Sequence, residues 1–215
     1  LDKRKKNALI MPHAIKDFPH VTTSLFGDYY QWLLNILIIA KVNTSVNWLI
    51  KPHPTSYLFG EIGVVEKLMK KLNVNNVKVL PKNFSTSAIP DLADIILTVC
   101  GTSGLEFACF GIPVINAGNS MYSNYGFNIE PKSIVEYYKT LSNISQINKL
   151  TDDQITTAKN VAYYIFVHNH HAPSYVFKGY KEGQSYLELF SNCISNYNLD
   201  NSINSTYESW IKKYI

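Results

Sequence analysis

Three segments of the sequence carry residue types that bind or activate anionic ligands. The first is Lys51-Pro52-His53-Pro54, in which two prolines hold the backbone around a histidine extended. A histidine fixed in this way can donate a hydrogen bond to a phosphate oxygen, and Lys51 adds a cation. The alternative is a proline-rich turn that exposes His53 to solvent and holds no ligand.

The second segment places two hydroxyl groups between two glycines. It contains, in order, Cys100, Gly101, Thr102, Ser103, Gly104, Leu105 and Glu106. The glycines allow close backbone approach, the hydroxyls donate hydrogen bonds, and a helix that starts here favours an anion. Glu106 is placed to accept hydrogen bonds from a ribose diol. The alternative is a helix cap, with Glu106 completing a capping box. The segment matches neither the Walker loop nor the Gly-x-Gly-x-x-Gly fingerprint.

The third segment is a polar loop that contains His13, Lys16, Asp17 and His20. Beside a nucleotide, His13 and Asp17 would act as a general base or contact the donor phosphate. These two are therefore the candidate catalytic residues. The alternative is that both are ordinary surface residues of the loop.

No metal site is expected from the sequence. The cluster His168-Asn169-His170-His171 has no carboxylate or cysteine that completes a tetrahedral zinc set, so we interpret it as a solvated helix end. The sequence contains no Asp-x-Asp triplet that would ligate a divalent ion bridging a diphosphate. We expect no cofactor.

Short apolar runs that alternate with helical stretches predict the elements that position these segments. Strands are expected at residues 7–11, 46–51, 77–80, 94–99 and 112–116. Helices are expected at residues 28–42, 59–72, 85–92, 105–110, 132–141, 151–168 and 184–196. Strands separated by helices imply an α/β fold, a Rossmann-like doubly wound parallel sheet that binds ligands at the carboxyl ends of its strands. Residues 1–130 would form this nucleotide-binding core, and the helices of 131–215 would pack on it or complete the same domain.

The composition excludes wholesale disorder and a protein with several membrane spans. Of the 215 residues 46% are hydrophobic, and the longest apolar run, residues 32–40, is shorter than the roughly 20 residues of a span. The net charge of +4 fits an anionic ligand or a membrane surface, and does not indicate a nucleic-acid binder. We interpret the basic run of residues 3–6 as a solvated linker.

The cysteines and the first residues of the sequence indicate the cellular compartment in which the protein is expected. The three cysteines, at positions 100, 109 and 193, form no metal-ligand spacing and no even set, which favours a reducing cytosol. Leu1 is followed by charged residues, so no signal peptide is expected. We expect a cytoplasmic protein that can associate with the inner face of the membrane.

Two stretches, residues 47–54 and 93–115, resemble the donor-binding half of GT-B glycosyltransferases. The resemblance is to bacterial capsule and surface-polysaccharide biosynthesis proteins, a group that includes capsular Kdo transferases and CDP-glycerol polymerase relatives. In that family a His-Pro motif and a Ser/Thr pair followed by an acidic residue hold the nucleotide-activated donor. The matching positions here are His53, Pro54, Thr102, Ser103 and Glu106. The family's Ser-Ser pair is Thr-Ser in this sequence, which keeps both hydroxyls.

The opening segments, residues 11–14 and 26–32, and the Gly-x-Pro-Val-Ile pattern of residues 111–115 are also similar to this family. The resemblance spans roughly residues 7–130 and implies a metal-independent glycosyltransferase that acts on a glycan or glycolipid acceptor. A GT-B enzyme has two Rossmann-like halves, so the acceptor half is expected elsewhere. Two alternatives stay open: a UDP-sugar epimerase of the same fold, with Asp17 and Glu106 as its carboxylates, and a non-catalytic α/β binding module.

Overall fold

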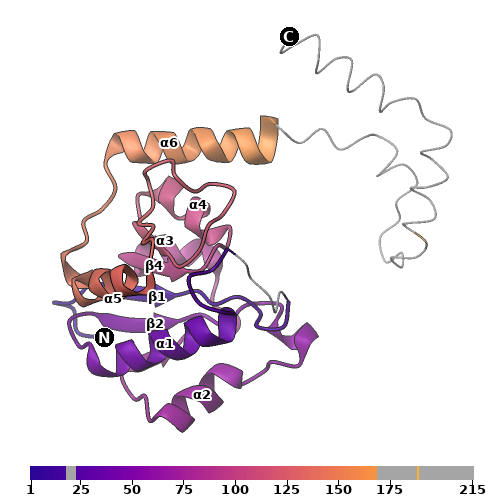
Figure 1. Ribbon diagram of the computed structural model, residues 1–215, viewed down its shortest axis with the longest axis vertical. Coiled ribbons are helices and arrows are strands. Elements are labelled where there is room, and N and C mark those ends of the chain that lie inside the picture. The colour runs from indigo at the N-terminus through magenta and orange to yellow at the C-terminus, as the bar shows by residue number, and fades with distance from the viewer. Residues whose placement is uncertain (18–22, 169–187, 189–215) are drawn as a thin grey trace. The chain divides into compact units, whose positions relative to one another are not determined.

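Five strands form one parallel sheet with the order β3-β2-β1-β4-β5 (Figure 1). The computed structural model describes residues 1–17, 23–168 and 188. The strands are β1 (Asn7–Ile10), β2 (Asn47–Ile50), β3 (Val77–Val79), β4 (Ile95–Thr98) and β5 (Val114–Asn116). The strands are short and mainly apolar and have the spacing expected from the sequence, with Lys78 of β3 exposed, so the prediction of a Rossmann-like α/β fold is confirmed.

Helices connect the strands and continue beyond the last of them. The α-helices are α1 (Tyr29–Val42), α2 (Val64–Leu72), α3 (Ile89–Leu92), α4 (Ser103–Glu106), α5 (Ile134–Ser142) and α6 (Asp152–Tyr163). The 3₁₀ turns are η1 (Ser56–Phe59), η2 (Thr86–Ala88), η3 (Ala108–Phe110) and η4 (Ile144–Gln146). Asp28 caps α1 by accepting a hydrogen bond from the amide of Gln31, and Ser133 caps α5 in the same way through the amide of Glu136.

The helices expected at residues 59–72, 85–92 and 105–110 differ from the structure, and the one at 85–92 consists of η2 followed by α3. The helix expected at residues 59–72 begins only at Val64, because Gly60 and Gly63 adopt positive φ angles of 68° and 73° that end one helical turn and precede the next. The helix expected at residues 105–110 is divided into α4 and η3. The helix expected at 151–168 continues past α6 as a π-helical turn, η5 (Tyr164–His168), and the helix expected at 184–196 lies outside the described residues except for position 188.

The sheet is covered on both faces, as Figure 1 shows, with α1, α2 and α5 on one face and α3 and α4 on the other. Successive residues of a strand point to opposite faces, so Ala8 and Ile10 pack with the α1 face while Leu9 packs with the α3 face. Trp32 of α1 is fully buried in the first of these cores. This double cover fixes the sheet and leaves the loops at the strand ends to form the site.

The strand order brings the three segments identified in the sequence together at the carboxyl ends of the strands. β1 lies between β2 and β4, and it pairs in parallel with both. The loops that follow these three strands therefore leave the same edge of the sheet side by side. The chain runs from β1 to β2 on one side and returns to β4 on the other, which is the arrangement at which open α/β sheets bind ligands.

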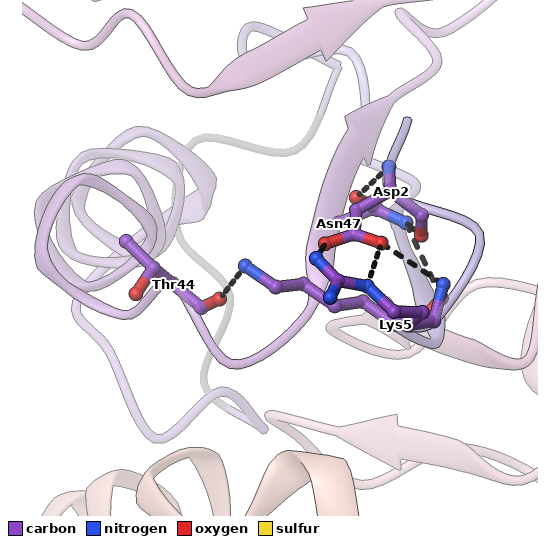
Figure 2. Close-up of polar contacts among 5 residues, drawn as sticks. Asp2, Lys5, Thr44 and Asn47 are labelled. Atoms are coloured by element: carbon purple, nitrogen blue, oxygen red, sulfur yellow. Dashed lines mark hydrogen bonds and ion pairs between the residues drawn. The ribbon is translucent and has the colours of Figure 1, made fainter.

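Residues 3–5 are exposed, as expected for a solvated segment, but the basic run is hydrogen-bonded to the fold and is not a linker. Nζ of Lys5 donates to the carbonyl oxygen of Thr44 at 2.7 Å, and the side chain of Asn47 exchanges hydrogen bonds with the backbone of Asp2 (Figure 2). Nζ of Lys6 donates to the carbonyl oxygen of Ile147 at 2.6 Å. These cations bind backbone carbonyls that the adjoining turns leave free.

The chain divides into two compact units, residues 1–162 and residues 163–215. The first contains the sheet and also α5, whose Tyr137 and Leu141 lie in the same core as Trp32. In the second unit the structure describes only residues 163–168 and 188. Within the described residues, no helix has the length and the apolar character needed to cross a membrane.

Candidate functional site

A hollow at the carboxyl ends of β1, β2 and β4 brings together eight of the ten predicted site residues. Its volume is about 170 Å³. The predicted residues that line it are His13, Lys51, His53, Pro54, Gly101, Thr102, Ser103 and Glu106. They come from three loops that lie up to 93 positions apart in the sequence, so the parallel sheet assembles the hollow. Met11, Pro12, Pro52, Thr86 and Thr98 complete the lining.

Lys51 supplies a cation that has no partner of its own. The residue directly follows β2, its amide donates to the carbonyl oxygen of Ile10, and it is only 8% exposed. Across the described part of the chain, no carboxylate is paired with Nζ of Lys51 and no acceptor is hydrogen-bonded to it. A mostly buried ammonium group without a counter-ion is costly, so the site favours an anion.

His53 is held as a hydrogen-bond donor. Its Nδ1 accepts a hydrogen bond from the amide of Thr55 at 3.3 Å and lies 2.8 Å from the Thr55 hydroxyl oxygen. Because Nδ1 accepts, the proton of the neutral ring belongs on Nε2, which has no partner among the residues that the structure describes. Burial lowers the pKa of His53, and so does Lys51, while Asp17 and Glu61 act in the opposite direction. The free site therefore presents a neutral N–H group.

The turn after β4, whose residues line the same hollow, contains three unpaired amides. Gly104 and the two residues after it donate their amides back to the carbonyls of Gly101 and Thr102. The amides of Gly101, Thr102 and Ser103 have no acceptor within residues 1–17, 23–168 and 188. We expected a helix dipole to support an anion here, but α4 has only four residues, so its dipole is small. An anion at this turn would therefore be bound by hydrogen bonds from individual amide and hydroxyl groups.

The carboxylate of Glu106 is free to accept hydrogen bonds. The capping-box alternative is wrong, because Thr102 occupies the cap position and makes no side-chain capping hydrogen bond. Glu106 is exposed and lines the hollow with no hydrogen-bond partner for its carboxylate in the described parts of the chain. This leaves the side chain available to a ligand that carries hydroxyl groups.

His13 lines the hollow and is fixed by its neighbours. Its ring stacks on Tyr29, the first residue of α1, with centroids 4.0 Å apart and an interplanar angle of 8°. The amide of Cys100 donates to Nε2 at 3.4 Å, so the proton lies on Nδ1. Burial, helped by the nearby His53, lowers the pKa of His13 to about 4, so the ring is neutral at pH 7. Since the Nε2 lone pair is directed at the protein's own backbone, the geometry favours a hydrogen-bond donor over a general base.

Two predicted site residues do not line this hollow. Asp17 is an exposed residue of the loop after β1, and it acts on the site only by raising the pKa of His13 and His53 against the effect of burial. Gly104 is buried below the turn, where a Cβ atom would lie 2.8 Å from Cζ of Tyr122. The fourth residue of the expected polar loop, His20, lies outside the described residues.

Glu61 is a site-forming residue that the sequence analysis missed. It is 7% exposed, and its two carboxylate oxygens accept the amides of Ile15 and Lys16 at 2.9 and 2.7 Å. This pairing holds the loop that carries His13 against the loop between β2 and α2. The signal in the sequence was weak: a single acidic residue flanked within two positions by glycines.

A second hollow of about 140 Å³ adjoins the first. Both are lined by the same five residues, which form a wall between them: Pro12, His13, Pro52, His53 and Pro54. The apolar lining of the second hollow includes Leu33 of α1, Val65 of α2 and Leu80, which follows β3. Nζ of Lys82 lies at its rim, 5.2 Å from the ring centroid of Tyr57.

Two solved structures from Thermosulfurimonas dismutans are similar to this chain. For KpsC, beta Kdo 2,7 transferase, the TM-score is 0.47 at 19% sequence identity, and the match covers 74% of this chain and 45% of that chain. For KpsC, beta Kdo 2,4 transferase, the values are 0.44 and 17%, with the same shares covered. This chain therefore spans less than half the length of either transferase. No protein-family model and no curated protein matches the sequence.

The described residues contain no group of three or more His, Cys, Asp or Glu side chains placed to hold a metal ion. The histidines at positions 170 and 171 lie outside the described part of the chain. The chemistry that the described hollow offers consists of one unpaired ammonium group, imidazole N–H groups, backbone amides, hydroxyls and one free carboxylate.

Proposed function

We propose that this chain contains the nucleotide-sugar donor-binding domain of a metal-independent glycosyltransferase in capsule or surface-polysaccharide biosynthesis. The observation that carries the proposal is the unpaired ammonium of Lys51 in a hollow that also presents three free amides and the Nε2–H of His53. This set of donors complements the phosphate of a nucleotide. Glu106, at the same hollow, would accept from ribose hydroxyls.

In such a reaction the nucleotide is the leaving group, and negative charge develops on its phosphate. Lys51 and His53 would stabilise this charge by donation, in the role that a divalent cation fills in other transferases. The hydroxyls of Thr102 and Ser103 would donate to further phosphate oxygens. The acceptor, a glycan or glycolipid, would bind to a second Rossmann-like half outside the described residues, which contain one such sheet.

The test is calorimetric titration of the chain with CMP, CDP, UMP and UDP and with the nucleosides cytidine and uridine. His53→Ala should weaken nucleotide binding by about 1.5–3 kcal/mol, the value of a hydrogen bond to a charged group, or roughly ten- to hundredfold. Binding of a nucleoside, which has no phosphate, should hardly change. Glu106→Gln should weaken the binding of nucleotides and nucleosides alike, because both contain the ribose.

Four outcomes would contradict the proposal. If the wild-type chain binds none of the four nucleotides, the hollow is not a nucleotide site. Equal losses of affinity for nucleotide and nucleoside in the His53 variant would refute the contact of His53 with phosphate. Unchanged binding in the Glu106 variant would refute the contact of Glu106 with ribose. A large loss of affinity on adding EDTA, restored by Mg²⁺ or Mn²⁺, would contradict metal independence.

Binding of a nucleotide-sugar should be accompanied by proton uptake near pH 6. In the free site, burial holds the pKa values of His13 and His53 below the ordinary value of 6.5, so both rings are mainly neutral at pH 7. A phosphate beside them favours the charged form and raises these pKa values, so the complex holds more protons than the free protein. Affinity should therefore increase as the pH falls from 7 to 6.

The measurement is titration calorimetry with UDP-glucose in buffers of different ionisation enthalpy. UDP-glucose is suitable because its phosphate groups do not titrate in this range. His53→Ala should reduce the number of protons taken up. Proton release on binding, or an uptake that His53→Ala leaves unchanged, would show that His53 is not next to the phosphate.

A further inference from the structure

Tyr122 lies directly beneath the turn that offers its amides to the hollow. It belongs to the loop after β5, is 2% exposed, and its hydroxyl donates to the carbonyl oxygen of Gly101. The same carbonyl accepts the amide of Gly104 at 2.9 Å. The sequence analysis did not single out this tyrosine, and it does not line the hollow.

The absence of a side chain at Gly104 makes room for Tyr122. A Cβ atom at this position would lie 2.8 Å from Cζ and 2.9 Å from Cε2 of the tyrosine ring, closer than real Cβ contacts allow. A glycine at position 104 is therefore required by the tyrosine below the turn.

The loop that carries Tyr122 is itself fixed. The tyrosine ring stacks near Phe127, with centroids 6.3 Å apart. At the start of the loop, the amide of Leu25 donates to the carbonyl oxygen of Ala117, and the amide of Asn119 donates to the carbonyl oxygen of Thr23. The hydroxyl of Tyr122 thus reaches Gly101 from a rigid support.

The geometry of the peptide unit connects this contact to the site. The carbonyl of Gly101 and the amide N–H of Thr102 belong to one trans peptide and point in opposite directions. A hydroxyl that holds the carbonyl from below therefore holds the Thr102 amide directed away from the tyrosine. Glycine at position 101 would otherwise let this peptide rotate easily.

We propose that Tyr122 is a positioning residue that keeps the Gly101–Ser103 turn in its anion-binding orientation by holding the Gly101 carbonyl. The inference rests on the proposed function and identifies the support of that same site. It predicts that loss of one buried hydroxyl weakens the binding of ligands that carry a phosphate and spares those that do not.

The first test compares Tyr122→Phe with Tyr137→Phe. Tyr137 of α5 is a matched control because it is also fully buried and its hydroxyl makes a hydrogen bond with a different partner, accepting from Nε1 of Trp32 at 2.9 Å. Tyr122→Phe should weaken binding of CDP or UDP by roughly three- to tenfold and leave cytidine or uridine unchanged. Tyr137→Phe should change neither. Full nucleotide affinity in Tyr122→Phe, or equal losses for nucleotide and nucleoside, would overturn the proposal.

Hydrogen exchange in the ligand-free protein separates this proposal from the proposed function. If Tyr122 holds the Gly101 peptide, Tyr122→Phe should speed exchange of the Gly104 amide, which loses its acceptor when the peptide rotates, and Tyr137→Phe should not. Gly104→Ala, which displaces the tyrosine ring, should produce the same increase. Unchanged exchange in both site variants would overturn the positioning role, whereas faster exchange in a protein that binds no nucleotide would overturn only the proposed function.

Discussion

Lys51→Met is expected to make the protein more stable and to remove most of its affinity for nucleotides. Lys51 is 8% exposed, and no acid within the described residues neutralises it. Methionine keeps the length of the stem and removes the charge, so the free energy of unfolding should increase by about 1 kcal/mol. Loss of a buried charge partner for phosphate should cost about 3 kcal/mol of binding free energy, or roughly a hundredfold in affinity.

The opposite signs of the two effects make this variant informative. If Lys51 had a structural role, its replacement would lower the stability of the protein. If it is kept for binding a ligand, its replacement raises the stability of the protein. Lys78→Met is the matched control, because Lys78 is exposed on β3 and its replacement changes the net charge by the same amount. The control should leave both stability and nucleotide affinity nearly unchanged. Thermal unfolding and calorimetric titration give the two numbers, and a less stable Lys51→Met protein with full affinity would refute the assignment.

Glu61→Gln is expected to be strongly destabilising, although it changes only one atom of the side chain. Both carboxylate oxygens of Glu61 accept backbone amides, those of Ile15 and Lys16. Glutamine has one acceptor oxygen, and its NH₂ group would face the second amide, so one hydrogen bond to a charged group is lost and two donors are brought together. The expected loss of stability is about 1.5–3 kcal/mol. In a domain of this size that corresponds to a decrease in Tm of roughly 5–10 °C.

The variant should also affect ligand binding, because the loop held by Glu61 carries His13. Glu66→Gln is the control: Glu66 lies on α2, is exposed, and has no hydrogen-bonded partner among the described residues. Its replacement should leave Tm within about 1 °C of wild type, as expected for a surface position. A Tm for Glu61→Gln equal to that of Glu66→Gln would show that the two amides do not depend on the carboxylate.

The strands of this fold were predictable because each is a short apolar run that ends at a proline, a glycine or a polar residue. Burial on both faces of a parallel sheet requires such runs, so the pattern and the structure have the same cause. The start of α2 was not predictable from apolar spacing. Ile62 continues the helical pattern in the sequence, yet it is 70% exposed and precedes the helix, because Gly60 and Gly63 interrupt the backbone.

For the site, the sequence predicted which loops meet and missed what holds them. Loops that follow neighbouring parallel strands leave the same end of the sheet, so the meeting of His53 with Ser103 follows from the strand order, in which β1 lies between β2 and β4. The unpaired state of Lys51, the tautomer that Thr55 imposes on His53, and the contact of Tyr122 with Gly101 depend on side-chain packing between segments distant in sequence. No local pattern of residues encodes such contacts.

The wall between the two hollows has a consequence for the thermodynamics of recognition. Three of its five residues are Pro12, Pro52 and Pro54, whose rings fix φ in the unbound protein. One of its two histidines is already stacked on Tyr29, and the other is bonded to Thr55. Little conformational entropy remains to be lost when a ligand arrives, so discrimination between ligands depends on charge and shape at a surface whose form is set before binding.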